Sequence, residues 1–147
     1  MGLIHADAGS AIAFQADVTN RSDVGRMVEA ALATYGRLDI LFNNAGISVR
    51  GTILDVDEEN FDQVFAVNVK GVFLGCKEAI PVMKSQGGGV ILNTASQLGV
   101  VGTKASVLYP ASKGSVIQLT RCLALDHATD GIRVNCVCPG PVDTPLA

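Results

Sequence analysis

The chain has 147 residues, a length typical of one domain, and its 14 acidic and 11 basic residues give a formal net charge of −3. This charge offers no electrostatic basis for binding nucleic acid or an anionic membrane, so neither is expected as a partner. Apolar residues make up 48% and charged residues 17%, which supplies a core and excludes a disordered chain or a small disulfide scaffold. No apolar run approaches the roughly 20 residues of a membrane span and no signal peptide is evident, which predicts a cytoplasmic protein.

The four cysteines and two histidines give no metal-binding pattern. No C-x-x-C spacing occurs, and His5 and His127 are isolated, so no metal site is predicted. Cys136 and Cys138 are two residues apart, a spacing that places both on one face of a strand. We interpret all four as small buried hydrophobic residues: Cys76, Cys122, Cys136 and Cys138.

The first predicted element is a buried strand over residues 11–16, an apolar run that ends in the polar sequence Asp17-Val18-Thr19. A helix over residues 24–35 follows, because its apolar positions recur at intervals of three and four residues. Thr19 or Ser22 is expected to cap its start, and Gly36 to close its end.

The next predicted strand covers residues 38–42 and stops at Asn43-Asn44-Ala45-Gly46. Residues 57–84 have a helical pattern, with acidic residues at the start where the helix dipole favours negative charge. This stretch is long enough for two helices, and we expect a break near residues 67–68. Pro81 is tolerated only near the end of such a helix.

The last third of the chain repeats the alternation of strand and helix. Three glycines at 87–89 end the preceding helix, and residues 90–94 form the third predicted strand. A long helix over residues 109–129 is capped by Gly131 and leads to a fourth strand over residues 132–137.

Strands that alternate with helices indicate an α/β fold built from βαβ units, with a parallel sheet covered on both faces. In such a sheet, ligands bind beyond the carboxyl ends of the strands. The following residues come directly after predicted strands and should share that rim: Asp17, residues 43–46, Ser96 and residues 139–144.

Tyr109 and Lys113 are four residues apart on a predicted helix, so they share one face. A lysine cation at this distance favours the phenolate form of a tyrosine, which suits the phenol to moving protons. Taken alone, such a pair is more typical of an ordinary helix surface than of an active site. Ser96, thirteen residues before Tyr109 and at the end of the third predicted strand, brings a hydroxyl to the same rim.

The resulting Ser-x12-Tyr-x3-Lys pattern resembles the active-site signature of the short-chain dehydrogenase/reductase family. The resemblance extends over about residues 11–147. It includes Asn-Asn-Ala-Gly at 43–46, Asn68 within Val-Asn-Val-Lys-Gly-Val-Phe, and Pro-Gly-Pro-Val-Asp-Thr at 139–144. It implies an oxidoreductase that uses NAD or NADP and acts on an alcohol or ketone.

The resemblance also implies roles for single residues. Tyr109 would be the general acid and base, and Lys113 would favour its deprotonated form and hold the nicotinamide ribose. Ser96 would donate a hydrogen bond to the substrate oxygen, and Asn68 would anchor a water that links Lys113 to solvent. The structural alternatives are a strand-end hydroxyl for Ser96 and a helix-break residue bonded to the backbone for Asn68.

Cofactor contacts follow from the same resemblance. Asp17 and Val18 would lie near adenine, although a turn or cap is the alternative for Asp17. Asn44, Ala45 and Gly46 would lie under the adenosine ribose, Tyr109 and Lys113 near the nicotinamide ribose. The nicotinamide carboxamide would meet a segment that begins at Pro139 and includes Gly140, Val142 and Thr144.

The chain departs from the family pattern at both ends. It has no glycine-rich phosphate turn that opens a helix, and it stops just past Thr144. We therefore expect one partial domain over residues 1–147, an incomplete Rossmann-like doubly wound parallel sheet without its first βαβ unit and its C-terminal segment. The strand at residues 11–17 would then pair anew beside residues 38–42 or pack by another route.

Two function classes follow from this departure. The chain is the catalytic segment of an oxidoreductase, with weak NAD(P) binding on its own, or a non-catalytic fragment or pseudoenzyme that survives as an association module. The predicted helices over residues 68–84 and 109–129 carry more apolar residues than one buried face needs. Together with the resemblance, this predicts a homo-oligomer, a dimer or a tetramer.

Overall fold

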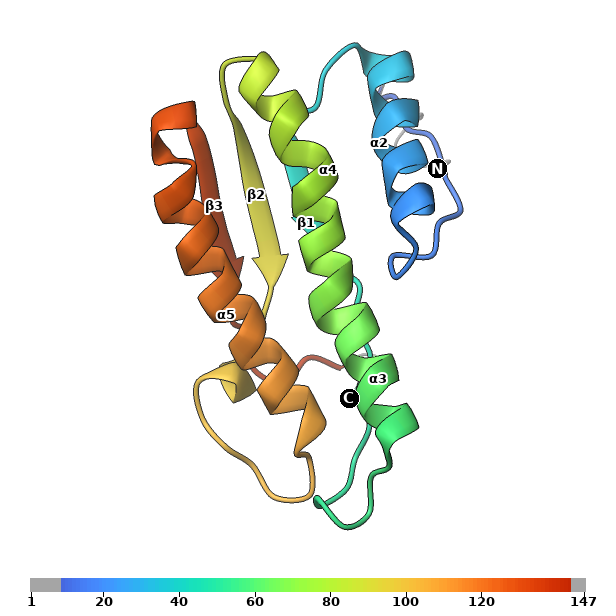
Figure 1. The fold of residues 1–147 in the computed structure, drawn as a ribbon, viewed down its shortest axis with the longest axis vertical. Coiled ribbons are helices and arrows are strands. Elements are labelled where there is room, and N and C mark those ends of the chain that lie inside the picture. Colours follow the sequence, from blue (N-terminus) through green and yellow to red (C-terminus); the bar gives the residue numbers. More distant parts are fainter. Residues whose placement is uncertain (1–8, 144–147) are drawn as a thin grey trace.

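The computed structural model describes residues 9–143, which form a parallel three-stranded sheet with helices packed against it (Figure 1). Its strands are β1 (Ile40–Asn43), β2 (Gly89–Thr94) and β3 (Ile132–Val137). Its helices are α2 (Arg21–Tyr35), α3 (Glu58–Phe65), the π-helical turn η1 (Ala66–Lys70), α4 (Gly71–Ser85), the 3-10 turn η2 (Gln97–Gly99), α5 (Leu108–Asp126) and the 3-10 turn η3 (Ala128–Asp130). None of these helices is long and apolar enough to cross a bilayer.

The strands lie in the order β1-β2-β3, and both pairs are parallel. The register places Leu41 beside Ile91 and Ile91 beside Val134. Because the strands run in one direction, the segments that follow them emerge at the same edge of the sheet (Figure 1). This confirms the expected parallel α/β arrangement.

Only one face of the sheet is covered by the helices within residues 9–143. Leu41, Ile91 and Val134 are buried against α4 and α5. The alternate positions point the other way, and Ile40 is 65% and Phe42 is 52% exposed. The expectation of cover on both faces is therefore wrong for the described part. The alternation of strands and helices suggested cover on both faces, but the described helices that pack on the sheet, α4 and α5, lie on one side.

Residues 11–16 do not form the predicted buried strand. Most of the segment is exposed, including Ile12 at 46% and Phe14 at 40%. A strand needs a hydrogen-bonding neighbour, and this segment does not run beside β1. It leads instead to Val18, whose side chain packs against Gly71 at the start of α4, where an added Cβ would lie 3.1 Å from Val18 Cγ2.

Helix α2 flanks α4 on the side away from α5 (Figure 1). Its N-cap is Asn20, whose side chain accepts a 2.9 Å hydrogen bond from the backbone N–H of Ser22. The prediction of Thr19 or Ser22 as the cap is wrong, because Thr19 bonds to Asp17 through both its N–H and its hydroxyl. Gly36 closes the helix in the left-handed conformation, as predicted.

The expected break near residues 67–68 is a π-helical turn, η1, between α3 and α4. The backbone stays helical there, but its hydrogen bonds span five residues in place of four, and Asn68 in this turn is buried inside the fold. Pro81 lies in the last turns of α4. Helix α5 ends at Asp126, earlier than predicted, and η3 carries the chain on to Gly131, which has a φ of 72°.

The four cysteines have unequal surroundings. Cys76 is buried and Cys136 is half-buried, whereas Cys122 and Cys138 are exposed. The prediction that all four are buried is wrong for the latter two, because Cys122 lies on the outer side of α5 and Cys138 lies beyond the end of β3.

Candidate active site

Ser96 lies just beyond β2, in a turn that is joined to the exit of β3. The backbone N–H of Ala95 donates to the oxygen of Val137 at 2.9 Å, and that of Gln97 donates to the oxygen of Pro139 at 3.0 Å. Ser96 is 6% exposed, and its Oγ accepts a 3.1 Å hydrogen bond from the N–H of Leu98. Ser96 therefore has the strand-end role given above as the structural alternative, in which its hydroxyl oxygen bonds to the backbone. This bond leaves the hydroxyl proton of Ser96 available.

Lys113 connects α5 to the same strand end. Its Nζ donates a 2.6 Å hydrogen bond to the backbone oxygen of Thr94, the last residue of β2. The side chain is almost fully buried, and this burial lowers the pKa of Lys113. The same Nζ lies 5.7 Å from the ring centroid of the half-buried Tyr109, as the four-residue spacing predicts.

A close backbone approach holds the Ser96 turn against α5. A Cβ added at Gly99, the last residue of η2, would lie 2.8 Å from the backbone carbon of Lys113 and 2.9 Å from the backbone nitrogen of Gly114. Only a residue without a side chain fits this contact. The structure thus brings Ser96, Tyr109 and Lys113 to one end of the sheet, and Gly99 is a supporting residue that sequence reasoning missed.

Asn68 is fully buried and joins three segments. Its Oδ1 accepts a 2.8 Å hydrogen bond from the N–H of Ile47, and its Nδ2 donates 2.9 Å bonds to the oxygen of Ile47 and to the Oγ of Ser112. This is the backbone-bonding role expected for a helix-break residue. Ser112 in turn donates to the backbone oxygen of Tyr109 at 2.8 Å. Sequence reasoning missed Ser112, although its position beside Lys113 in the signature is a usable signal.

Gly46 occupies the space between the two polar groups of the site. A Cβ there would lie 3.4 Å from both Asn68 Oδ1 and Lys113 Nζ. The absence of a side chain lets the backbone after β1 lie close to the buried ammonium. An ammonium carries three N–H donors, so Lys113 can donate to a ribose hydroxyl as well as to Thr94. The described residues therefore fit the nicotinamide side of a dinucleotide.

The polar residues after β1 belong to a hydrogen-bonded network along the strand ends. Asn44 Oδ1 accepts a 2.8 Å bond from the Thr94 hydroxyl. Asn43 Nδ2 donates to Asn93 Oδ1 at 2.9 Å, and Asn93 Nδ2 donates to the Thr120 hydroxyl at 2.9 Å. Asn44 and Ala45 are themselves exposed, so this network positions an accessible loop.

The other predicted cofactor residues that the structure describes lie in two segments, residues 17–18 and residues 139–142. Asp17 follows no strand, and two hydrogen bonds from Thr19 lower its pKa, with a smaller effect from Lys70. Val18 contacts the start of α4, next to the turn that holds Asn68. Pro139 is bonded to Gln97, Gly140 and Val142 lie on the following exposed segment, and Thr144 lies outside the described residues.

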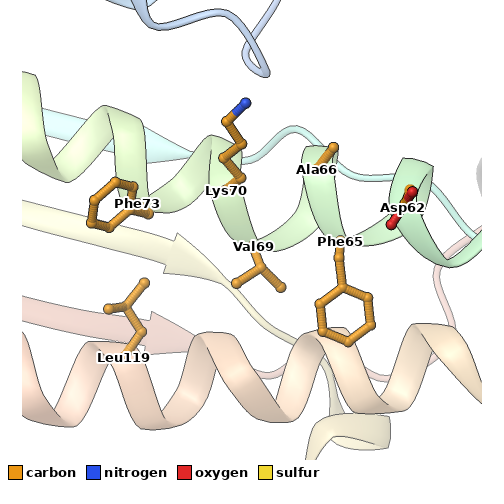
Figure 2. A pocket seen from close by; sticks show the side chains of 7 residues that line it. All are labelled: Asp62, Phe65, Ala66, Val69, Lys70, Phe73 and Leu119. Atoms are coloured by element: carbon orange, nitrogen blue, oxygen red, sulfur yellow. The ribbon is translucent and has the colours of Figure 1, made fainter.

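An apolar hollow of about 630 Å³ lies elsewhere, on the outer side of α3, η1, α4 and α5 (Figure 2). Its lining consists mainly of apolar side chains, with one carboxylate and one ammonium at the edge: Asp62, Phe65, Ala66, Val69, Lys70, Phe73 and Leu119. It contains none of the signature residues. Within residues 9–143, no three His, Cys, Asp or Glu side chains gather as a metal site would require.

Comparison with known proteins decides the family, because the family model of short chain dehydrogenases matches residues 3–147. The chain belongs to the short-chain dehydrogenase/reductase family. The 2-(R)-hydroxypropyl-CoM dehydrogenase of Xanthobacter autotrophicus is 44% identical over 145 residues, which cover 97% of this chain and 58% of that enzyme. This chain of the short-chain dehydrogenase/reductase family thus spans little more than half the length of that relative.

Solved structures of the family agree with this assignment. A short-chain dehydrogenase/reductase from Burkholderia phymatum in complex with NAD superposes with a TM-score of 0.94 at 32% identity, covering 99% of this chain and 53% of that one. ElxO with NADP bound superposes with a TM-score of 0.87 at 34% identity, covering 90% of this chain and 54% of that one. The fold is therefore part of a Rossmann-like domain, and related structures hold both NAD and NADP.

Proposed function

We propose that this chain carries the catalytic residues of an oxidoreductase that transfers a hydride between NAD or NADP and an alcohol or ketone. The observation that carries the proposal is the hydrogen bond from Lys113 Nζ to the oxygen of Thr94. It joins the helix that bears Tyr109 and Lys113 to the strand end that bears Ser96. Three groups able to act on one substrate oxygen thus share one end of the sheet.

The nicotinamide, when bound, supplies or accepts the hydride. Tyr109 would give a proton to the substrate oxygen during reduction and take it back during oxidation. Ser96 would donate a hydrogen bond to the same oxygen, and the positive charge of Lys113 would stabilise negative charge that develops there. Asn68 would hold the loop after β1 in place and anchor a water beside Lys113.

Cofactor binding would use the residues around the same sheet edge. Tyr109 and Lys113 would hold the nicotinamide ribose, with Asn44, Ala45 and Gly46 under the adenosine ribose. Asp17 and Val18 would lie near adenine, and the segment from Pro139 through Gly140, Val142 and Thr144 would meet the carboxamide. The structures of relatives with NAD and NADP support both cofactors as candidates.

We also propose that the chain associates with a second copy through α4 and α5. The apolar hollow in Figure 2 lies on the outer side of these helices, and Phe73 at its edge is 46% exposed. A helix that is apolar on two sides buries the second side against another surface. An identical surface related by a two-fold axis would cover it.

A chimera tests the catalytic proposal. This chain replaces the matching segment of the Xanthobacter autotrophicus 2-(R)-hydroxypropyl-CoM dehydrogenase, and NADH or NADPH formation is followed with 2-(R)-hydroxypropyl-CoM, a secondary alcohol. We expect turnover, and Tyr109→Phe should lower kcat by about 10²- to 10⁴-fold without loss of cofactor binding. Tyr35→Phe is the matched control, because Tyr35 lies on α2. A folded, cofactor-binding chimera without turnover, or a Tyr109→Phe variant with more than about a tenth of the activity, would overturn the proposal.

A further inference from the structure

Two thiols stand at the exit of β3, where the proposed catalytic mechanism uses neither of them. Along β3, Ile132 and Val134 are buried on the face that α5 covers. Cys136 continues this face and is half-buried beside the core, and Cys138 comes two residues later, where it is exposed. Successive alternate residues of an extended chain lie on the same side, so the two side chains are neighbours.

The electrostatic surroundings of Cys136 agree with this placement of the two thiols. Burial raises the pKa of Cys136, and Cys138 adds to the rise both through its charge and through hydrogen bonding. The pair therefore consists of one accessible thiol and one partly covered thiol within reach of each other.

A direct disulfide does not suit this geometry. Alternate residues of a strand have Cα atoms about 6.6 Å apart, near the upper limit for disulfides, and same-face Cβ atoms are equally far apart. A disulfide requires Cβ atoms roughly 3.5 to 4.5 Å apart, so the backbone would have to bend. A bridging atom that binds both sulfurs spans the gap with less distortion of the backbone. Thiolates are ligands that favour such soft, thiophilic elements.

We propose that Cys136 and Cys138 form a dithiol site that takes a trivalent organoarsenical, with both sulfurs bound to one arsenic. With phenylarsine oxide, the two S–H protons and the arsenic-bound oxygen leave as one water, and two As–S bonds form. The arsenic stays trivalent, so no oxidant or reductant is needed. Cys138 attacks the arsenic first because its thiol is exposed, and the nearby Cys136 then displaces the remaining oxygen and closes the ring.

Binding of arsenic to Cys136 and Cys138 should disturb the turn that contains Ser96. The backbone oxygens on either side of Cys138, those of Val137 and Pro139, accept hydrogen bonds from Ala95 and Gln97. These donors flank Ser96. Drawing Cys138 toward Cys136 would shift Pro139 and weaken its 3.0 Å bond from the N–H of Gln97.

To test the site, the full chain is incubated with phenylarsine oxide in excess 2-mercaptoethanol, and the mass of the protein is then measured. We expect one phenylarsenic group per chain that resists the monothiol and is released by 2,3-dimercaptopropanol. The Cys122→Ser variant is the matched control and should retain the adduct, since its thiol is exposed on α5. Cys138→Ser and Cys136→Ser should each retain at least about tenfold less, because a single thiol competes poorly with the monothiol.

Cys138→Ser decides the outcome if Cys136→Ser disturbs the core, because position 138 is exposed. Retention of the adduct by folded Cys138→Ser, or no retained adduct on the unsubstituted chain, would overturn the site. Hydrogen exchange checks the link to Ser96, since the adduct should speed exchange of the Gln97 amide. Unchanged exchange at Gln97 in the adduct would overturn that link.

Discussion

The ammonium of Lys113 donates a 2.6 Å hydrogen bond to the backbone oxygen of Thr94. A cation that is 2% exposed loses most of its hydration, and one carbonyl replaces only part of it. The lowered pKa of Lys113 reflects this imbalance. Folding therefore disfavours the charged form of Lys113, and such perturbed groups are enriched at functional sites.

The first prediction concerns the pH dependence of stability. Because the folded pKa of Lys113 lies below its unfolded value, the unfolded chain binds more protons between the two pKa values. Relative to Lys113→Met, the free energy of unfolding of the unsubstituted chain should therefore rise with pH and level off above about 10.4. Urea unfolding between pH 7 and 11 measures this difference. Lys104→Met, at an exposed position, should show no such trend, and a flat difference for Lys113→Met would contradict the prediction.

The second prediction concerns the Asn68 clamp, the three hydrogen bonds that join Asn68 to Ile47 and Ser112. Asn68→Ala leaves the N–H and oxygen of Ile47 and the hydroxyl of Ser112 without their partner. We expect the free energy of unfolding to fall by about 2 to 4 kcal/mol, the cost of several polar groups left unpaired in the interior. Asn135→Ala, on the exposed side of β3, should change it by less than about 0.5 kcal/mol. Equal effects of the two variants would show that the clamp contributes little.

The sequence predicted correctly those elements that neighbouring residues in the chain determine. The strand at residues 132–137 has the predicted bounds, and Gly36 closes α2 as its position after the periodic residues indicates. Residues 11–16 have an equally strand-like composition. They form no strand because a strand must pair with a second strand. The sequence of residues 11–16 does not indicate whether such a partner strand lies beside them.

The candidate site likewise has a part that the sequence predicted and a part that depends on tertiary packing. The spacing of Ser96, Tyr109 and Lys113 predicted that they lie at one end of the sheet, because strand ends and helix faces follow from periodicity. The clamp from Asn68 to Ile47 and Ser112 was beyond such reasoning. Its partners are 21 and 44 residues from Asn68, and only the packing of η1 between the loop and α5 brings them together.

The third prediction concerns Gly75, which lies on α4 against the end of β1. A Cβ at this position would overlap the side-chain amide of Asn43, which bonds to Asn93 at 2.9 Å. Gly75→Ala should lower the free energy of unfolding by about 1 to 3 kcal/mol, because Asn43 or the helix must shift. Gly102→Ala is the matched control, since nothing lies within 4 Å of its added Cβ. Urea unfolding that ranks Gly102→Ala as the more harmful change would contradict this contact.

The last prediction concerns association of the chain with itself. Phe73 is 46% exposed at the apolar hollow between α4 and α5, so contact with a second copy would remove its ring from water (Figure 2). Sedimentation equilibrium at micromolar concentrations should give a mass above that of the 15.2 kDa chain. Phe73→Glu places a charge in that contact and should weaken association at least about tenfold, since an unpaired buried charge is strongly unfavourable. Ile53→Glu is the control, because Ile53 is 69% exposed in a loop that does not line the hollow. A single 15.2 kDa species of the unsubstituted chain would exclude the interface, and equal weakening by both variants would place the contact elsewhere.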